Sequence, residues 1–305
     1  MAVRLDVVRA GELSVPALAA HSRAALDVPL ASTAQLQVAI ASGHGVLVGA
    51  FQRAHGLSEL GPVRRRGSGG PELHVAAGSL HVLLSLASPD ALVACDETRI
   101  VNRHVRPLLR ALAKTGHLAH FYGRDWVSLG GRPVAWVGFA HDTSTRRTAF
   151  EALVAVGAPY VVHPRRSLRG KEPSVVPVEP QRLATAILDA YARDTHAVTV
   201  SMAVLPDEGE PPAQPEWVAT REEVIGTIGA GPDAQGHFRI GGDLLVSRDA
   251  LTRLEESVVQ NHADIGRLVD ATLSAPGVAL DGVRSLVSVG DCVTEALEAS
   301  ARLQG

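Results

Sequence analysis

The sequence predicts an α+β protein, in which a mixed or antiparallel sheet flanked by helices precedes a small α+β accessory domain. Apolar runs of strand length alternate irregularly with segments of helical spacing. Two apolar runs that flank Gly130-Gly131 indicate a hairpin. A stretch rich in proline and acidic residues, 206–214, indicates a linker between residues 1–205 and residues 215–305. Periodicity alone leaves other α+β arrangements open.

The first part of the chain contains two predicted helices among strands. A strand is expected at Met1–Val8, and Ser14 before Val15-Pro16 is a helix start for 15–26. Ser32-Thr33-Ala34-Gln35 predicts a second helix that ends near Gly43. The remaining apolar runs predict strands at Gly45–Gln52 and Leu80–Ala87.

The middle of the chain holds its clearest helical pattern. Apolar residues recur at helical intervals over Thr98–Lys114, although Pro107 inside the pattern predicts a kink or a break. The following residues predict a strand over 117–122 and the two arms of the hairpin over 123–129 and 133–140.

The last predicted elements surround the linker. A strand is expected over 150–156, a helix with proline at its start over 180–193, and strands over 198–205 and 236–245. Three further helices are predicted, at Ser247–Val259, His262–Leu273 and Cys292–Ala301.

Composition limits the class of protein. The 305 residues are 46% apolar, which is ample for a core, and the net charge is −3. Only the run Arg64–Arg66 is strongly basic, so no nucleic-acid partner is expected. Cys95 and Cys292 lie far apart without metal-type spacing, which favours a reducing compartment. With no signal peptide and no apolar run that could span a bilayer, we expect a cytoplasmic protein without a membrane partner.

The stretch Arg64-Arg65-Arg66-Gly67-Ser68-Gly69-Gly70, here called the glycine loop, is the strongest candidate site. Glycine N–H groups can form an anion-binding concavity, and arginine supplies planar donors that suit phosphate and carboxylate. A solvated basic loop before a strand is the simpler interpretation of such a stretch.

Together with its flanking strands, the glycine loop resembles that of the lipoate–protein ligase branch of the biotin and lipoate ligase superfamily. In that family a strand ending in Gly-x-x-Gln precedes Arg-Arg-x-Ser/Thr-Gly-Gly-Gly, and Gly-Asn-Leu opens the next strand. The matching residues here are Arg65, Arg66, Ser68, Gly69, Gly70, Gly78 and Leu80. Pro71 replaces the third glycine, and Val75 replaces a histidine. The resemblance covers nearly the whole chain through the hairpin with Asp125, the segment 168–175 that contains Lys171, and the strand with Asp243.

The resemblance implies a class II synthetase or biotin-ligase-like fold and an acid-activating enzyme. Such ligases form an acyl-adenylate from ATP, accompanied by Mg²⁺, and lipoate or another small carboxylic acid such as octanoate. They then transfer the acyl group to an amine, usually a lysine of a lipoyl-type carrier domain. Arg66 is the implied catalytic residue. The implied nucleotide-binding residues are Arg65, Arg66, Ser68, Gly69, Gly70, Gly78 and Asp125. The implied walls for the acyl chain are Val46, Leu80, Val82 and Trp136.

One departure from the family puts this activity in question. The family's catalytic lysine follows the hairpin turn, where this chain has Pro133, which has neither charge nor donor. Loss of a preorganised donor costs roughly 10²–10³ in rate. Arg132 beside it could supply the charge, although an exposed turn arginine is the simpler interpretation. Trp136 replaces a family glycine and could fill part of the pocket.

Two other functions therefore stay open. A pseudoenzyme of the same fold would bind a small acid, a nucleotide or a carrier domain without ligating. A cysteine-dependent acyltransferase would use Cys95 as its nucleophile, with Asp96 and His104 nearby in sequence, although a structural cysteine is the simpler interpretation. His141-Asp142 is at most half of a metal site, so no metal site is predicted.

Overall fold

An eight-stranded mixed sheet is the centre of the computed structural model, which describes residues 3–54, 61–161, 168, 170–201, 203, 205–261 and 264–304. The strand order is β11-β1-β2-β6-β10-β9-β8-β7. In chain order the strands are β1 (Val3–Leu13), β2 (Ala34–Ala41), β6 (Leu80–Leu86), β7 (Ala119–Phe121), β8 (Trp126–Leu129), β9 (Arg132–His141), β10 (Thr148–Val154) and β11 (Thr195–Thr199). β1 pairs in parallel with β2 and β11, and the other neighbours are antiparallel. The predicted α+β class, with a mixed sheet flanked by helices, is confirmed.

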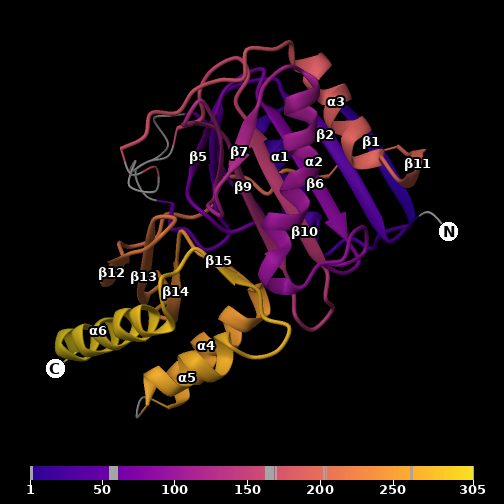
Figure 1. Ribbon diagram of the computed structural model, residues 1–305. Coiled ribbons are helices and arrows are strands. Elements are labelled where there is room, and N and C mark those ends of the chain that lie inside the picture. The colour runs from indigo at the N-terminus through magenta and orange to yellow at the C-terminus, as the bar shows by residue number, and fades with distance from the viewer. Residues whose placement is uncertain are drawn as a thin grey trace.

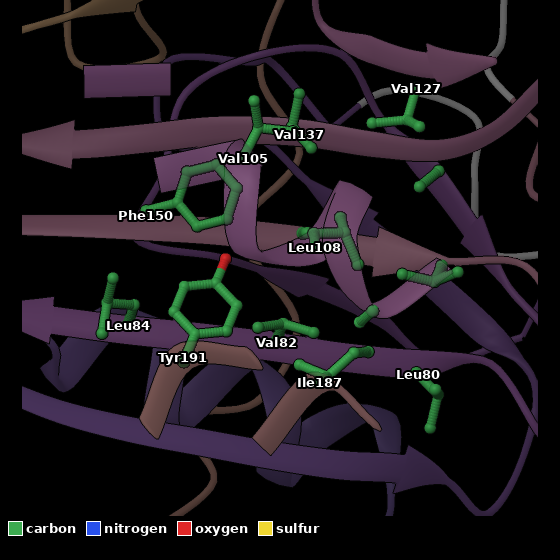
Figure 2. Close-up of a cluster of buried hydrophobic side chains, with 14 of the residues drawn as sticks. Leu80, Val82, Leu84, Val105, Leu108, Val127, Val137, Phe150, Ile187 and Tyr191 are labelled. Atoms are coloured by element: carbon green, nitrogen blue, oxygen red, sulfur yellow. The ribbon is translucent and has the colours of Figure 1, made fainter. Parts of the chain in front are cut away.

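Two helices, α2 (Ile100–Lys114) and α3 (Pro180–Ala192), cover one face of this sheet (Figure 1). The 3-10 turn η2 (Glu97–Arg99) precedes α2, and α2 continues through Pro107. Because side chains alternate across a strand, every second residue of β6 and β10 points into this helix-covered core. Figure 2 shows Leu80, Val82 and Phe150 there beside Tyr191 of α3.

The opposite face of the large sheet packs against α1 (Val15–Ala24) and a small sheet of order β4-β3-β5. The strands of the small sheet are β3 (Gly45–Val48), β4 (Val63–Arg65) and β5 (Leu73–Val75). The Ser14 hydroxyl accepts a hydrogen bond from the Ala17 N–H and caps α1, as its sequence predicts. The glycine loop leaves β4 on this side of the molecule.

The C-terminal part of the chain has a separate hydrophobic core. Its strands form a three-stranded and a two-stranded sheet: β12 (Ala219–Glu222), β13 (Thr227–Pro232) and β14 (Phe238–Gly242), then β15 (Leu245–Val246) and β16 (Leu280–Asp281). Its helices are α4 (Arg248–Gln260), α5 (Ile265–Leu273) and α6 (Leu286–Gln304). Figure 1 shows these elements below the large sheet. The division of the chain at residues 206–214 stays a prediction.

Two element predictions are wrong. The segment predicted as a helix over 32–43 is strand β2. Its pairing with both β1 and β6 overrides the local helix-start signal at Ser32-Thr33. The strand predicted over 198–205 ends at Thr199 as β11. Residues 1–2, 169, 202, 204 and 262, which belong to predicted segments, lie outside the described residues. Within the described part of the chain, no helix has the length and apolar composition needed to cross a bilayer.

Candidate functional site

The glycine loop lies against β9 and the C-terminal part of the chain, and its N–H groups are used there. Gly69 N–H donates to the Phe139 carbonyl at 3.2 Å, and Gly70 N–H donates to the Leu244 carbonyl at 2.8 Å. The Gly67 N–H donates to a side-chain hydroxyl at 2.9 Å. A Cβ on Gly69 would lie 2.0 Å from the Leu244 oxygen, so only glycine permits this approach. The loop is therefore a backbone joint between the two parts of the molecule.

Arg66 is buried, with 1% of its surface exposed, and its guanidinium is bonded within the chain. Nη2 donates to the Gly69 and Pro71 carbonyls, both at 2.7 Å, and Nη1 donates to the Leu47 carbonyl at 2.8 Å. Nε donates to Ser68 Oγ at 3.0 Å. Burial lowers the pKa of Arg66 to about 10, so the side chain remains charged at neutral pH.

The indole ring of Trp136 packs against the glycine loop. The Arg66 guanidinium carbon lies 4.2 Å from the centre of the indole ring, within cation–π range. A Cβ on Gly70, whose φ is +90°, would lie 3.0 Å from the ring, and one on Gly138 would lie 2.4 Å from it. The ring therefore occupies a slot between two glycines, and 1% of Trp136 is exposed.

A buried carboxylate, Glu151 of β10, lies beside the loop. Ser68 Oγ donates to it, Ser22 Oγ donates to the same oxygen at 2.9 Å, and His81 Nε2 lies 2.6 Å from the other oxygen. Burial alone would raise the pKa of Glu151, but the hydrogen bond from His81 and the nearby charges of His81 and Arg66 outweigh it, so that pKa is lowered. A resident negative charge thus accepts the hydroxyl that the family resemblance assigns to phosphate binding.

Sequence reasoning missed Glu151, His81 and Ser22. The available signal was a polar residue inside an apolar strand for His81 and Glu151, and a lone serine in the helix predicted over 15–26 for Ser22. In the pairing of β6 with β10, His81 lies opposite Leu153, two residues along the strand from Glu151, so His81 and Glu151 are on the same face of the sheet. That register depends on tertiary pairing.

The remaining predicted nucleotide-binding residues are Arg65, Gly78 and Asp125, and each has a structural role or is buried. Arg65 Nη1 donates to three carbonyls of the turn after β3, at 2.7 to 3.0 Å. Gly78, with φ +84°, forms the turn before β6. Asp125 is 2% exposed, and burial raises its pKa to about 7 against the opposing effect of Arg124.

The predicted acyl-chain walls are not brought together. Leu80 and Val82 point into the core under α2 and α3, on the far face of the sheet from the glycine loop. Val46 packs on the outer side of the small sheet with Val48, whereas its neighbour Leu47 packs in the same cluster as Trp136. These three side chains therefore lie apart from Trp136 and the glycine loop. The sequence does not give the orientation of a strand that is apolar on both faces.

No lysine lies beside the glycine loop. Both lysines of the chain are exposed. Lys114 pairs with Asp189 at 2.8 Å, and Lys171 lies at the hairpin turn, with its Nζ 3.5 Å from the Gly131 carbonyl. Arg132 is exposed at the same turn, where its guanidinium lies 3.5 Å from the Glu172 carbonyl and 3.4 Å from the Pro173 carbonyl.

Cys95 lies on the other side of the large sheet, where it packs against the helix-covered core. Its thiol donates to the Asp96 carbonyl at 3.2 Å, and burial together with Asp96 raises its pKa to about 11, so the reactive thiolate is scarce at neutral pH. His104 is buried, and burial lowers its pKa to about 4. No group of three or more His, Cys, Asp or Glu residues in the described part of the chain is arranged to hold a metal ion.

The residues present do not fit the phosphates of ATP in this arrangement. Phosphate needs free N–H donors and an uncommitted cation. Here the N–H groups of Gly67, Gly69 and Gly70, and the guanidinium of Arg66, all donate to the chain itself. The carboxylate of Glu151 would also repel a second anion.

Comparisons with known proteins place the fold. No family sequence profile matches the chain, and no curated protein matches it by sequence. Among solved structures, LipL1 of P. falciparum in complex with lipoate has a TM-score of 0.60 at 10% identity, with 99% of this chain and 100% of that chain covered. The bi-partite lipoate protein ligase of Thermoplasma acidophilum has a TM-score of 0.53 at 15% identity, with 66% and 88% covered. Lipoate-protein ligase A bound with ATP has a TM-score of 0.51 at 14% identity, with 67% and 90% covered. The chain thus has the fold of lipoate–protein ligases.

Proposed function

We propose that this chain is a non-catalytic binding protein built on the lipoate-ligase fold, in which its own side chains close the acid-activating site. Its ligand or partner would bind outside the glycine loop. A small acid, a nucleotide and a carrier domain are the classes that the resemblance suggests.

The observation that carries this proposal is the carboxylate of Glu151 beside Ser68. It accepts hydrogen bonds from Ser68 and Ser22, and Ser68 is a residue to which the family resemblance assigns the binding of an anionic substrate. Because the pKa of Glu151 is lowered, the resident charge persists at neutral pH. An incoming carboxylate or phosphate would have to overcome that charge and displace Trp136.

A second candidate is the ATP-dependent activation of a lipoate- or octanoate-like acid, followed by transfer to an amine. Several buried polar atoms near the glycine loop favour it, because they have no hydrogen-bond partner among the described residues. They are Trp136 Nε1, Tyr160 Oη, Asp125 Oδ1 and His81 Nδ1. Native proteins leave few such atoms unpaired, and their concentration here would suit a polar ligand that enters after rearrangement.

Pyrophosphate exchange separates the two candidates. The full chain is incubated with ATP, Mg²⁺, labelled pyrophosphate and either lipoate or octanoate, and label in ATP is followed. The non-catalytic proposal predicts no exchange above a control without acid. Acid-dependent exchange that Pro133→Lys strengthens would instead establish the ligase.

Restoring the family's lysine and glycine tests whether Pro133 and Trp136 are the reason that the site does not activate an acid. The variants are Pro133→Lys, Trp136→Gly and the two combined, with Arg132→Ala as a matched surface control. We expect each single variant to stay inactive and the double variant to gain exchange, because a cation and space are both missing. Exchange by the unmodified chain at the level of the double variant would contradict the proposal.

A further inference from the structure

A cavity of about 390 Å³ lies where the N-terminal end of α2 meets the end of β7 and β16 of the C-terminal part. Its lining includes Arg99, Asn102, Arg103, Arg106, Phe121 and Asp281. It shares no lining residue with the glycine loop and belongs to the side of the sheet that α2 covers. Its volume lies within the range of about 300–1,000 Å³ that is usual for small-molecule sites.

Arg99, the last residue of η2, is followed by Arg103 and Arg106 of α2 at intervals of four and three residues, a spacing that places neighbouring side chains on one side of a helix. Arg99 has a weak ion pair, with Nε 3.5 Å from Asp96 Oδ2. Arg106 Nη2 donates to the Asn102 side-chain oxygen at 3.2 Å. Neither contact saturates a guanidinium, which has five N–H donors.

Arg103 is the central arginine of the three. Its Nε atom is buried and has no hydrogen-bond partner among the described residues. A hydrogen bond from Thr98 lowers the pKa of the nearby Asp96 carboxylate, and the charge of Arg103, which attracts that carboxylate, helps to lower it. A buried donor without an acceptor is costly, which makes an acceptor from outside the chain favourable at this point. Arg66 differs, because four of its five N–H donors bond to acceptors of the chain itself.

The charge of the lining is positive. Against the three guanidiniums it contains one carboxylate, Asp281, one oxygen of which accepts the Gly282 N–H at 2.7 Å. Burial raises the pKa of Asp281 above its usual range. The lining residues therefore carry a net positive charge, which Asp96 beside Arg99 and Arg103 offsets in part, in a chain whose net charge is −3.

We propose that this cavity binds a small phosphorylated molecule of about the size of a mononucleotide. A phosphate group offers three oxygens and up to two negative charges, and the fork geometry of arginine matches it. The half-buried ring of Phe121 provides an apolar wall on which a planar base can stack. The site would exist whether or not the glycine loop binds ATP.

Isothermal titration calorimetry of the full chain with AMP, adenosine and inorganic phosphate tests the proposal. We expect AMP to bind at least tenfold more tightly than adenosine, phosphate alone to bind more weakly than AMP, and the AMP affinity to fall as NaCl rises. No AMP binding at low salt, or equal binding of adenosine and AMP, would overturn it.

Variants locate the binding. Arg103→Ala should weaken AMP binding at least tenfold, and Arg103→Lys should weaken it less. Arg110→Ala is the matched control, because Arg110 lies on the same helix and does not line the cavity. The affinity of this variant for AMP should stay within twofold of that of the unmodified chain. Thermal melts of each variant verify folding. AMP binding that survives Arg103→Ala but is lost in Gly69→Ala would place the nucleotide at the glycine loop and refute the proposal.

Discussion

Two basic regions of this molecule differ in how far the N–H donors of their arginines are bonded within the chain. In the glycine loop, Arg66 is buried and donates to three carbonyls and a hydroxyl. At the N-terminal end of α2, Arg103 lines a cavity and has a buried Nε without a partner. The conspicuous motif in the sequence is thus structural, whereas an inconspicuous helix side holds unused donors. A basic motif therefore indicates a ligand site only where its donors are left over after folding.

The largest effect should come from removing the satisfied arginine. Arg66→Ala leaves the carbonyls of Leu47, Gly69 and Pro71 without their donor in a buried place, so we expect the free energy of unfolding to fall by about 3–5 kcal/mol. Urea unfolding followed by circular dichroism measures it. Arg132→Ala, an exposed arginine, should change stability by less than about 0.5 kcal/mol. Equal losses of stability in the two variants would mean that the hydrogen bonds of Arg66 do not stabilise the fold.

A smaller effect should follow from a methyl group added at the joint. Gly69→Ala places a Cβ against the Leu244 carbonyl, which is backbone and yields poorly, so we expect a loss of about 2 kcal/mol. Gly43→Ala is the control, since nothing lies within 4 Å of its added Cβ. If limited proteolysis cleaves Gly69→Ala no faster than Gly43→Ala between the two parts of the chain, the loop is not the joint described.

An effect of similar size to that of Gly69→Ala concerns a buried carboxyl near the loop and appears only as a dependence on pH. Burial raises the pKa of Asp125 to about 7 from its usual value near 3.8. A folded-state pKa above the unfolded value means that stability is present at low pH and is lost as pH rises from about 4 to about 7. Asp125→Asn should remove this loss, so its stability relative to the unmodified chain should improve by about 2 kcal/mol between pH 5 and pH 8. Urea unfolding at both pH values measures the difference, and a constant difference would show that Asp125 is solvated.

The sequence was sufficient for the elements whose signal is local. The hairpin strands β8 and β9, α1 with its Ser14 cap, and the amphipathic α2 follow from turn residues, capping and 3.6-residue periodicity. The resemblance carried by the glycine loop led to the ligase fold that the structural comparisons support.

The site could not be derived in the same way, because it depends on pairing between distant segments. Glu151 and Ser68 are 83 residues apart, and nothing local indicates that a carboxylate from β10 meets a hydroxyl from the loop. The same holds for Val46 and Leu47, since a strand that is apolar at every position does not reveal which side faces Trp136. The segment 34–41 also shows tertiary pairing overriding a local helix start.

Hydrogen–deuterium exchange of the peptide spanning residues 64–72 tests the central claim most directly, since it reports whether the loop N–H groups are already bonded. The chain is measured alone and with ATP, Mg²⁺ and lipoate. The account predicts slow exchange of this peptide in the chain alone and no further protection with the ligands. Fast exchange in the chain alone, followed by protection when ATP and lipoate are added, would contradict it and make the glycine loop an open nucleotide site.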